Sequence, residues 1–185
     1  MMKLHRMGAG IAGVLLMAGT VVAGAQAASA ANPDGSFSLV AATGKCVEIL
    51  PDAGGNFYVA GNRIQQRTCD GSPQQRWFLQ VVGGNFHGIR NAPRYHLVNW
   101  LTLQCLDDMD GTTTNRNPVQ QWFCNGTNSM VWGLFDTSNP IGDQLVNDRS
   151  ETCLDVSDGS FADGARLQIY NCFDTGNFAQ HYTMQ

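Results

Sequence analysis

Apolar and polar positions alternate over short distances along most of this chain. The runs 37–40 (FSLV), 75–79 (QRWFL), 95–98 (YHLV) and 166–170 (RLQIY) are either alternating or briefly apolar. Clusters of Gly, Asn, Asp and Pro interrupt such runs about every 8–12 residues, which is typical of short strands joined by turns. After residue 30, no stretch keeps an apolar stripe at helical spacing for about 12 residues. The pattern therefore predicts an all-β fold.

The first thirty residues follow a different pattern. Lys3 and Arg6 make a short basic start, residues 7–25 are apolar and uncharged, and Ala28-Ser29-Ala30 is a small-x-small sequence. A membrane anchor is one interpretation, because such an apolar stretch approaches spanning length. The many Gly and Ala residues favour a secretory signal peptide cleaved after Ala30. We therefore expect residues 1–30 to be removed and the protein to be secreted, without a membrane span.

Three copies of one pattern fill the rest of the chain. In each copy an acidic residue stands two positions after a first Cys, and a second Cys follows 23, 19 and 19 residues after the first. Each copy closes on a large aromatic residue: Trp77, Trp132 or Tyr182. The copies cover about 37–80, 95–135 and 143–185, after a short tail at 31–36. We expect one domain over 37–185, with the closing aromatics in a three-fold core.

The six cysteines divide evenly among these copies. Six cysteines allow 15 pairings in principle, and no two are closer than 19 residues, which argues against a Cys/His metal site. Disulfides are the expected state in an oxidising compartment. The three copies then select one bridge per repeat. The expected pairs are Cys46–Cys69, Cys105–Cys124 and Cys153–Cys172.

Composition and charge exclude several functional classes. Of the 185 residues only 14% are charged, and the net charge of −4 argues against nucleic-acid binding. The acidic cluster Asp107, Asp108 and Asp110 lacks the other ligands of an EF-hand loop. His87, His96 and His181 belong to no catalytic motif. We expect no metal, no cofactor and no enzymatic activity.

The repeated motifs resemble those of a known family. Cys-Leu-Asp occurs at 105–107 and 153–155, Val-Gln-Gln-Trp-Phe-Cys at 119–124, and a closing Gln-Arg-Trp at 75–77. Three such repeats resemble the ricin B-chain type β-trefoil lectins, which include the family 13 carbohydrate-binding modules. The match runs from about Phe37 to Tyr182. The resemblance implies a six-stranded barrel capped by three hairpins, with up to one shallow sugar pocket per repeat.

The third repeat matches the family's sugar pocket best. By this resemblance, Asp155 is the carboxylate that accepts hydrogen bonds from sugar hydroxyls, and Tyr170 is the ring that stacks on the sugar. Gln168 is a supporting amide, and Gln180 is the amide of the closing motif. The family's Asn before that Gln is absent here, so Asn177 is the candidate for its role.

The other two repeats depart further from the family's pattern. The second repeat keeps Asp107, Gln120 and Trp122, but Met130 replaces the closing Gln, so Asn128 is expected to supply the missing amide. In the first repeat Glu48 and Arg67 stand at the carboxylate and aromatic positions. We expect sugar pockets in the second and third repeats and none in the first.

The sequence thus favours a secreted, non-enzymatic lectin for galactose- or xylose-type glycans or polysaccharides, as the resemblance implies. A β-trefoil that binds proteins or inhibits proteases is the alternative, because the fold also serves those functions. The long loops 52–62 and 80–95 of the first repeat would be its contact surface. A toxin's binding subunit is a third interpretation. A protein partner therefore stays open.

Overall fold

The computed structural model describes residues 32–86, 93–137, 140–173 and 176–185. The predicted signal peptide at 1–30 lies outside these residues, as do His87 and part of the loop 80–95. The described chain is all-β, as predicted, with short 3-10 turns and no α-helix. Its strands are β1 (Phe37–Ala41), β2 (Cys46–Ile49), β3 (Ile64–Arg67), β4 (Arg76–Val82), β5 (Arg94–Asn99), β6 (Cys105–Asp108), β7 (Val119–Trp122), β8 (Val131–Phe135), β9 (Gln144–Asn147), β10 (Cys153–Val156), β11 (Leu167–Tyr170) and β12 (Tyr182–Met184).

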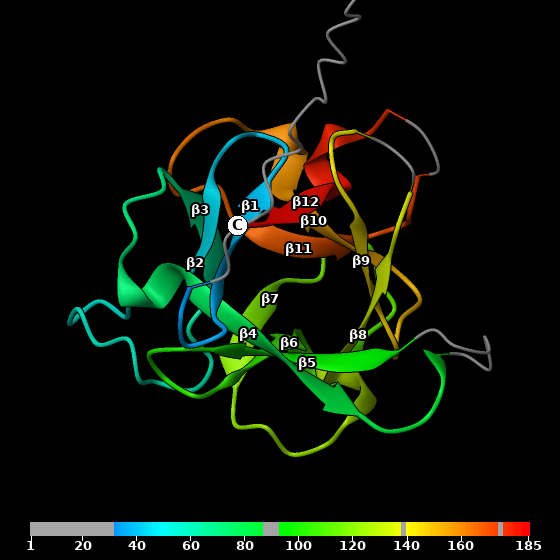
Figure 1. Cartoon of the computed structure of the whole chain (residues 1–185), viewed down its shortest axis with the longest axis horizontal. Helices are drawn as coiled ribbons and strands as arrows, with labels where there is room; N and C mark the ends of the chain where they lie inside the picture. The colour runs from blue at the N-terminus through cyan, green and yellow to red at the C-terminus, as the bar shows by residue number, and fades with distance from the viewer. Residues whose placement is uncertain (1–31, 87–92, 138–139, 174–175) are drawn as a thin grey trace, which may run out of the picture.

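Six of these strands form a closed barrel. Antiparallel pairing runs from β12 to β1, then through β4, β5 and β8 to β9. A bridge between Asp143 and Tyr182 closes the ring between β9 and β12, with two backbone hydrogen bonds of 2.9 Å. In Figure 1 the first repeat is coloured blue to green, the second green to yellow-green and the third yellow to red.

The other six strands form three hairpins that cap the barrel. They are β2–β3, β6–β7 and β10–β11, one from each repeat. In the second strand of each hairpin, which is β3, β7 or β11, three of the four residues are buried. Three repeats of four strands give the β-trefoil, so the predicted fold is confirmed.

The closing aromatics lie in the core, as predicted. Trp77, Trp132 and Tyr182 are at most 1% exposed. The indole Nε1 of Trp77 donates to the carbonyl oxygen of Val47 at 2.9 Å, and that of Trp132 donates to Leu106 at 3.0 Å. Each Trp therefore ties a barrel strand to the hairpin of its own repeat while burying a large apolar surface.

The three disulfides join the predicted pairs, one in each repeat. They are Cys46–Cys69, Cys105–Cys124 and Cys153–Cys172. Each bridge fastens the loop after a hairpin back to the first hairpin strand. Closing loops of this length contributes about 3 kcal/mol each in the chain-entropy model.

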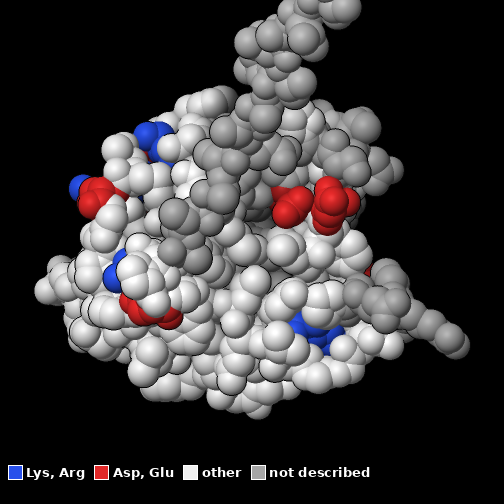
Figure 2. Space-filling model, viewed as in Figure 1, with Lys and Arg blue, Asp and Glu red and all other residues white. Residues whose placement is uncertain are grey.

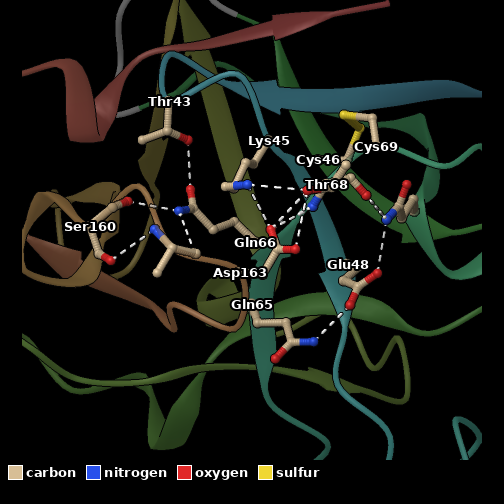
Figure 3. Close-up of polar contacts among 12 residues, drawn as sticks. Thr43, Lys45, Cys46, Glu48, Gln65, Gln66, Thr68, Cys69, Ser160 and Asp163 are labelled. Carbon is tan, nitrogen blue, oxygen red and sulfur yellow. Dashed lines mark hydrogen bonds and ion pairs between the residues drawn. A yellow bond between two sulfur atoms is a disulfide. The ribbon is translucent and has the colours of Figure 1, made fainter.

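Buried glutamines connect neighbouring repeats, which the sequence motifs did not reveal. Gln66 is fully buried, and its Nε2 donates to the carbonyl oxygens of Ser160 at 2.7 Å and Ala162 at 3.0 Å (Figure 3). Gln121 is its counterpart in the second repeat and donates to Phe57 and Val59. A loop of the third repeat thus docks on the first, and a loop of the first docks on the second.

The surface carries few charges, as the composition predicts. Figure 2 shows small groups of charged side chains separated by wide uncharged areas on one face of the molecule. Among the described residues, no helix has the length and apolar character needed to cross a membrane.

Candidate functional site

The third repeat carries a surface pocket of about 240 Å³ beside its hairpin β10–β11. Four of the five predicted residues line it: Asp155, Gln168, Tyr170 and Asn177. Asp155 faces Gln168 across the two strands, because these residues are partners in the antiparallel register. Tyr170 lies two residues further along β11, on the same face of the strand. The alternation of the hairpin therefore brings the carboxylate, amide and ring together.

Two amides hold the Asp155 carboxylate in place. Gln168 Nε2 donates to Oδ1 at 2.8 Å, and Gln180 Nε2 donates to Oδ2 at 3.2 Å. Asp155 is only 5% exposed, and this burial raises its pKa, although the two amides oppose the shift. Each carboxylate oxygen has a second lone pair, so the group can still accept hydrogen bonds from a ligand in the pocket.

The closing Gln180 does not line the pocket, which corrects the prediction that it contacts sugar. Its side chain is fully buried. The Nε2 atom donates to Asp155 and also to the carbonyl oxygen of Asn171 at 2.9 Å, while Oε1 accepts from the Phe173 N–H at 3.0 Å. All its bonding capacity faces inward, so Gln180 positions Asp155 instead of touching a ligand.

Aromatic rings make the apolar side of the third-repeat pocket. Tyr170 and Phe173 stack with ring centroids 5.9 Å apart, and both rings line the pocket. Phe173 is 46% exposed. The motif comparison missed Phe173, although an aromatic residue directly after a disulfide cysteine in a polar loop could have indicated it.

Asn177 presents an amide N–H₂ group at this pocket. Its Oδ1 accepts a hydrogen bond from the Ala179 N–H at 3.2 Å at the start of the 3-10 turn η6 (Phe178–Gln180). The oxygen is thus occupied, and the donor side of the amide is available to the pocket. Ala179, which stands where the family has Asn, also lines the pocket but offers no polar side chain.

A larger pocket of about 780 Å³ lies at the equivalent place in the second repeat. Asp107, Gln120, Trp122 and Asn128, the four residues predicted for this repeat, all line it. Asp107 faces Gln120 in the register of β6 and β7, and Trp122 is 38% exposed. The two repeats thus present the same three groups in the same order.

The carboxylate of the second repeat is held less completely. Gln120 Nε2 donates to Asp107 Oδ2 at 2.9 Å, but Oδ1 has no hydrogen-bond partner. Met130, buried at the position of Gln180, cannot donate to it. Burial raises the pKa of Asp107, and the side chains of Gln120 and Ser129 oppose this shift. An unsatisfied buried oxygen is costly, so a ligand hydroxyl would be a favourable partner.

Asn128 lines the second-repeat pocket from a position one residue further along its 3-10 turn than Asn177 in the third repeat. It lies in η4 (Asn128–Met130), and its Oδ1 accepts from Arg94 Nη2 at 3.1 Å. This contact uses the amide oxygen, and the role of Asn128 as a replacement for the missing glutamine stays a prediction. Arg149 also lines the pocket and was missed, because it comes from the following repeat.

The first repeat keeps the amide network and lacks the aromatic ring. Glu48 accepts hydrogen bonds from Gln65 at 2.7 Å and from Gln75 at 3.0 Å (Figure 3). The carboxylate is only 2% exposed. The exposed Arg67 stands where Trp122 and Tyr170 stand in the other repeats. A guanidinium gives a poor apolar face for a neutral sugar, which agrees with the expectation for this repeat.

The loop 52–62 lies against the second repeat. Besides the contacts of Gln121, the amide of Gln104 donates to the carbonyl oxygen of Tyr58 at 2.9 Å. Most of its residues, 52–56, 58 and 59, are exposed. The loop therefore keeps an exposed surface, and the protein-binding interpretation stays open.

One group of potential metal ligands occurs in the described part of the chain. It consists of His96, Cys105 and Cys124, with ligand atoms within 4.8 Å of one another. The two sulfur atoms form a disulfide with each other, so they cannot act as thiolate ligands. This group therefore fits no metal.

Comparisons with known proteins agree with the geometry. Residues 85–170 match the family model described as ricin-type β-trefoil lectin domain-like. That match does not single out the family 13 carbohydrate-binding modules. No sequence among the curated proteins matches the chain.

Several solved structures share the fold. The designed three-fold symmetric protein ThreeFoil aligns with a TM-score of 0.68 and 25% identity, over 80% of this chain and 96% of that protein. The exo-β-1,3-galactanase 1,3Gal43A from Clostridium thermocellum aligns with a TM-score of 0.65 and 23% identity, over 80% of this chain and 29% of the galactanase. The Rhizoctonia solani agglutinin aligns with a TM-score of 0.63 and 17% identity, over 80% and 92%.

Proposed function

We propose that this chain, whose residues 85–170 match the ricin-type β-trefoil lectin-like family model, is a carbohydrate-binding protein with sugar sites in its second and third repeats. One observation carries this proposal. Two pockets in equivalent places each combine a buried carboxylate, a glutamine that holds it and an accessible aromatic ring. Asp107, Gln120 and Trp122 form one set, and Asp155, Gln168 and Tyr170 form the other.

These groups match the two chemical faces of a sugar ring. The C–H face of a pyranose packs on a flat aromatic ring such as Trp122 or Tyr170. Vicinal hydroxyl groups on the ring edge donate to Asp107 or Asp155, and charge-assisted hydrogen bonds of this kind are the stronger ones. The amides of Asn128 and Asn177 donate to a ring-edge oxygen.

Shallow pockets of this kind bind single sugars weakly. A ring contact and a few hydrogen bonds correspond to a dissociation constant of about 0.1–10 mM. Two sites that engage one polymer raise the apparent affinity by about 10²-fold or more. The preferred ligands are therefore polysaccharides or crowded glycans, and galactose- and xylose-containing ones are the first to test.

We infer that the protein binds sugar without cleaving it. The lectin-type domain supports this, and Asp155 has both oxygens engaged by amides. Each pocket also contains a second carboxylate, Asp110 or Asp158, so hydrolysis has to be measured directly. Release of reducing ends from a polymer that the protein binds would contradict this inference.

Secretion is part of the proposal. Residues 1–30 have the features of a signal peptide, and the three disulfides are suited to an oxidising compartment. Analysis of the N-terminus of the protein recovered from the culture medium tests this. Recovery only from the cytoplasm would contradict it.

The test of function is a glycan and polysaccharide array with the oxidised protein. Asp107→Asn and Asp155→Asn remove one carboxylate charge each and keep the side-chain shape. We expect each variant to weaken polymer binding at least about tenfold, because a hydrogen bond to a charged group contributes about 1.5–3 kcal/mol. Glu48→Gln is the matched control, since Glu48 occupies the same place in the repeat without an aromatic ring.

Fluorescence separates the two sites. Trp122 is the indole of the second-repeat pocket, so its emission should change when that pocket fills and should not change in Asp107→Asn. Trp100, the other accessible indole, is removed as background by Trp100→Phe. A folded protein that binds no glycan, or binding that all three carboxylate variants keep unchanged, would refute the lectin proposal.

A further inference from the structure

A third pocket, of about 280 Å³, lies where the three hairpins meet. We call it the arginine pocket, and it belongs to neither of the sugar sites described above. The residues that line it are Arg63, Arg116, Pro118, Arg166, Leu167 and Gln168.

The three repeats contribute equivalent positions to this pocket. Arg63, Pro118 and Arg166 each stand directly before the buried first residue of β3, β7 or β11. Each is bridged to a neighbouring repeat, Arg63 to Gln120, Pro118 to Gln168 and Arg166 to Gln65. These three bridges close a ring, so the three positions surround the pseudo-three-fold axis.

The charge of the pocket contrasts with that of the chain. The whole sequence has a net charge of −4, yet three guanidinium groups line this one small cavity. None of its lining residues is an Asp or Glu. Outside the pocket lining, Arg116 forms an exposed ion pair with Asp158 at 3.8 Å, and its charge also acts on Asp155.

Two of the arginines have unused hydrogen-bonding capacity. Arg63 Nη1 is buried and has no hydrogen-bond partner. Over the described ranges, the side chain of Arg166 makes no hydrogen bond or ion pair. A buried N–H group without a partner and three like charges side by side are both unfavourable. One oxyanion in the pocket would relieve both, because guanidinium groups bind tetrahedral oxyanions through paired hydrogen bonds.

The arginine pocket adjoins the third-repeat sugar pocket. Arg116 and Gln168 line both of them. An acidic substituent on a sugar held against Tyr170 would therefore point toward a site already lined by guanidinium groups. The second-repeat pocket shares neither of these two residues.

We propose that the arginine pocket binds a sulfate or phosphate group and, building on the sugar binding proposed above, that the third-repeat site prefers glycans carrying such a group. The anion lies between Arg63, Arg116 and Arg166. The sugar ring lies on Tyr170 with its hydroxyl groups on Asp155. Ester substitution of the glycan thus supplies the charge that the pocket lacks.

The first experiment uses inorganic anions and does not depend on sugar. Sodium sulfate and sodium phosphate are titrated at constant ionic strength against chloride, and the arginine side-chain N–H resonances of the labelled protein are followed by NMR. We expect saturable shifts at Arg63 and Arg166. Arg166→Gln should weaken anion binding at least about tenfold. Arg67→Gln, which removes the same charge from an exposed arginine at the end of β3 outside the pocket lining, is the control and should change nothing.

The second experiment compares a sulfated glycan with its neutral parent. We expect tighter binding of the sulfated form in the wild type and equal binding of both in Arg166→Gln. A neutral glycan that binds as well as the sulfated one, with no response to sulfate, overturns the inference and leaves the lectin function intact. Saturable sulfate binding with no glycan binding refutes the lectin function and keeps the anion site. Equal losses in Arg166→Gln and Arg67→Gln would mean unspecific charge attraction and would also overturn the inference.

Discussion

Asp108 occupies a buried position at which the other two repeats have apolar residues. The equivalent residues in the other repeats are Ile49 and Val156, all three fully buried at the ends of β6, β2 and β10. Asn117 Nδ2 donates to Asp108 Oδ1 at 2.5 Å, while Oδ2 has no partner. Burial, together with the negative charge of Asp107, raises the pKa of Asp108 to about 7.

This raised pKa makes stability depend on pH in a defined direction. A carboxyl with a higher pKa in the folded state binds more protons when folded, so the free energy of unfolding falls as pH rises from 3.8 to about 7. Below this range Asp108 is neutral and no charge is buried, and above it the full penalty of burying the charge applies. At 1.36 kcal/mol per pKa unit, that penalty is about 4 kcal/mol.

Asp108→Asn tests this reasoning because the amide keeps the shape, can still accept from Asn117 and carries no charge. The free energy of unfolding of both proteins is measured by urea denaturation between pH 4 and pH 8. We expect equal stability near pH 4 and a variant more stable by up to about 4 kcal/mol at pH 8. His96, whose pKa burial lowers, titrates with the opposite sign and cancels in the difference between the two proteins. A difference that stays constant with pH, or a variant less stable at pH 8, would refute the reasoning.

Two further changes test the packing between repeats. Gln66→Leu should lower the free energy of unfolding, measured by urea denaturation, by at least about 2 kcal/mol, because it leaves the carbonyl oxygens of Ser160 and Ala162 without their donor. A loss within about 0.5 kcal/mol, the usual range for surface changes, would contradict this role. Gly142→Ala should lower the melting temperature by several degrees. The φ of Gly142 is +126°, and a Cβ atom there would lie 2.5 Å from the backbone oxygen of Tyr182, where the barrel closes. An unchanged melting temperature would contradict this and show that the backbone at this closure shifts to admit the Cβ atom.

Much of the architecture could be predicted because it depends on a pattern that recurs three times. The alternation of apolar residues, the paired cysteines and the closing aromatics are local features, and their repetition at matching intervals leaves few arrangements that bury all of them. Asp155 and Tyr170 were assigned to one pocket from the resemblance to a known family, and the register of β10 and β11 places them on the same hairpin.

The role of Gln180 could not be predicted from the spacing of the sequence motifs. Its motif places it near Asp155, but only burial shows that its amide is used up by Asp155, Asn171 and Phe173. Phe173 was missed because an exposed ring in a loop has no periodic partner that would indicate its direction.

The sequence by itself determined an all-β fold of three repeats and its three disulfides, because these follow from local spacing, and the resemblance to a known family added the β-trefoil and the residues of the two pockets. Only the tertiary structure decided what meets across the repeats. Arg63 and Arg166 are about a hundred positions apart, each directly before a hairpin strand of its own repeat, and only closure of the hairpin ring places both on one pocket. Contacts around a pseudo-symmetry axis depend on how the repeats close on one another, and that closure is a property of the whole packed chain.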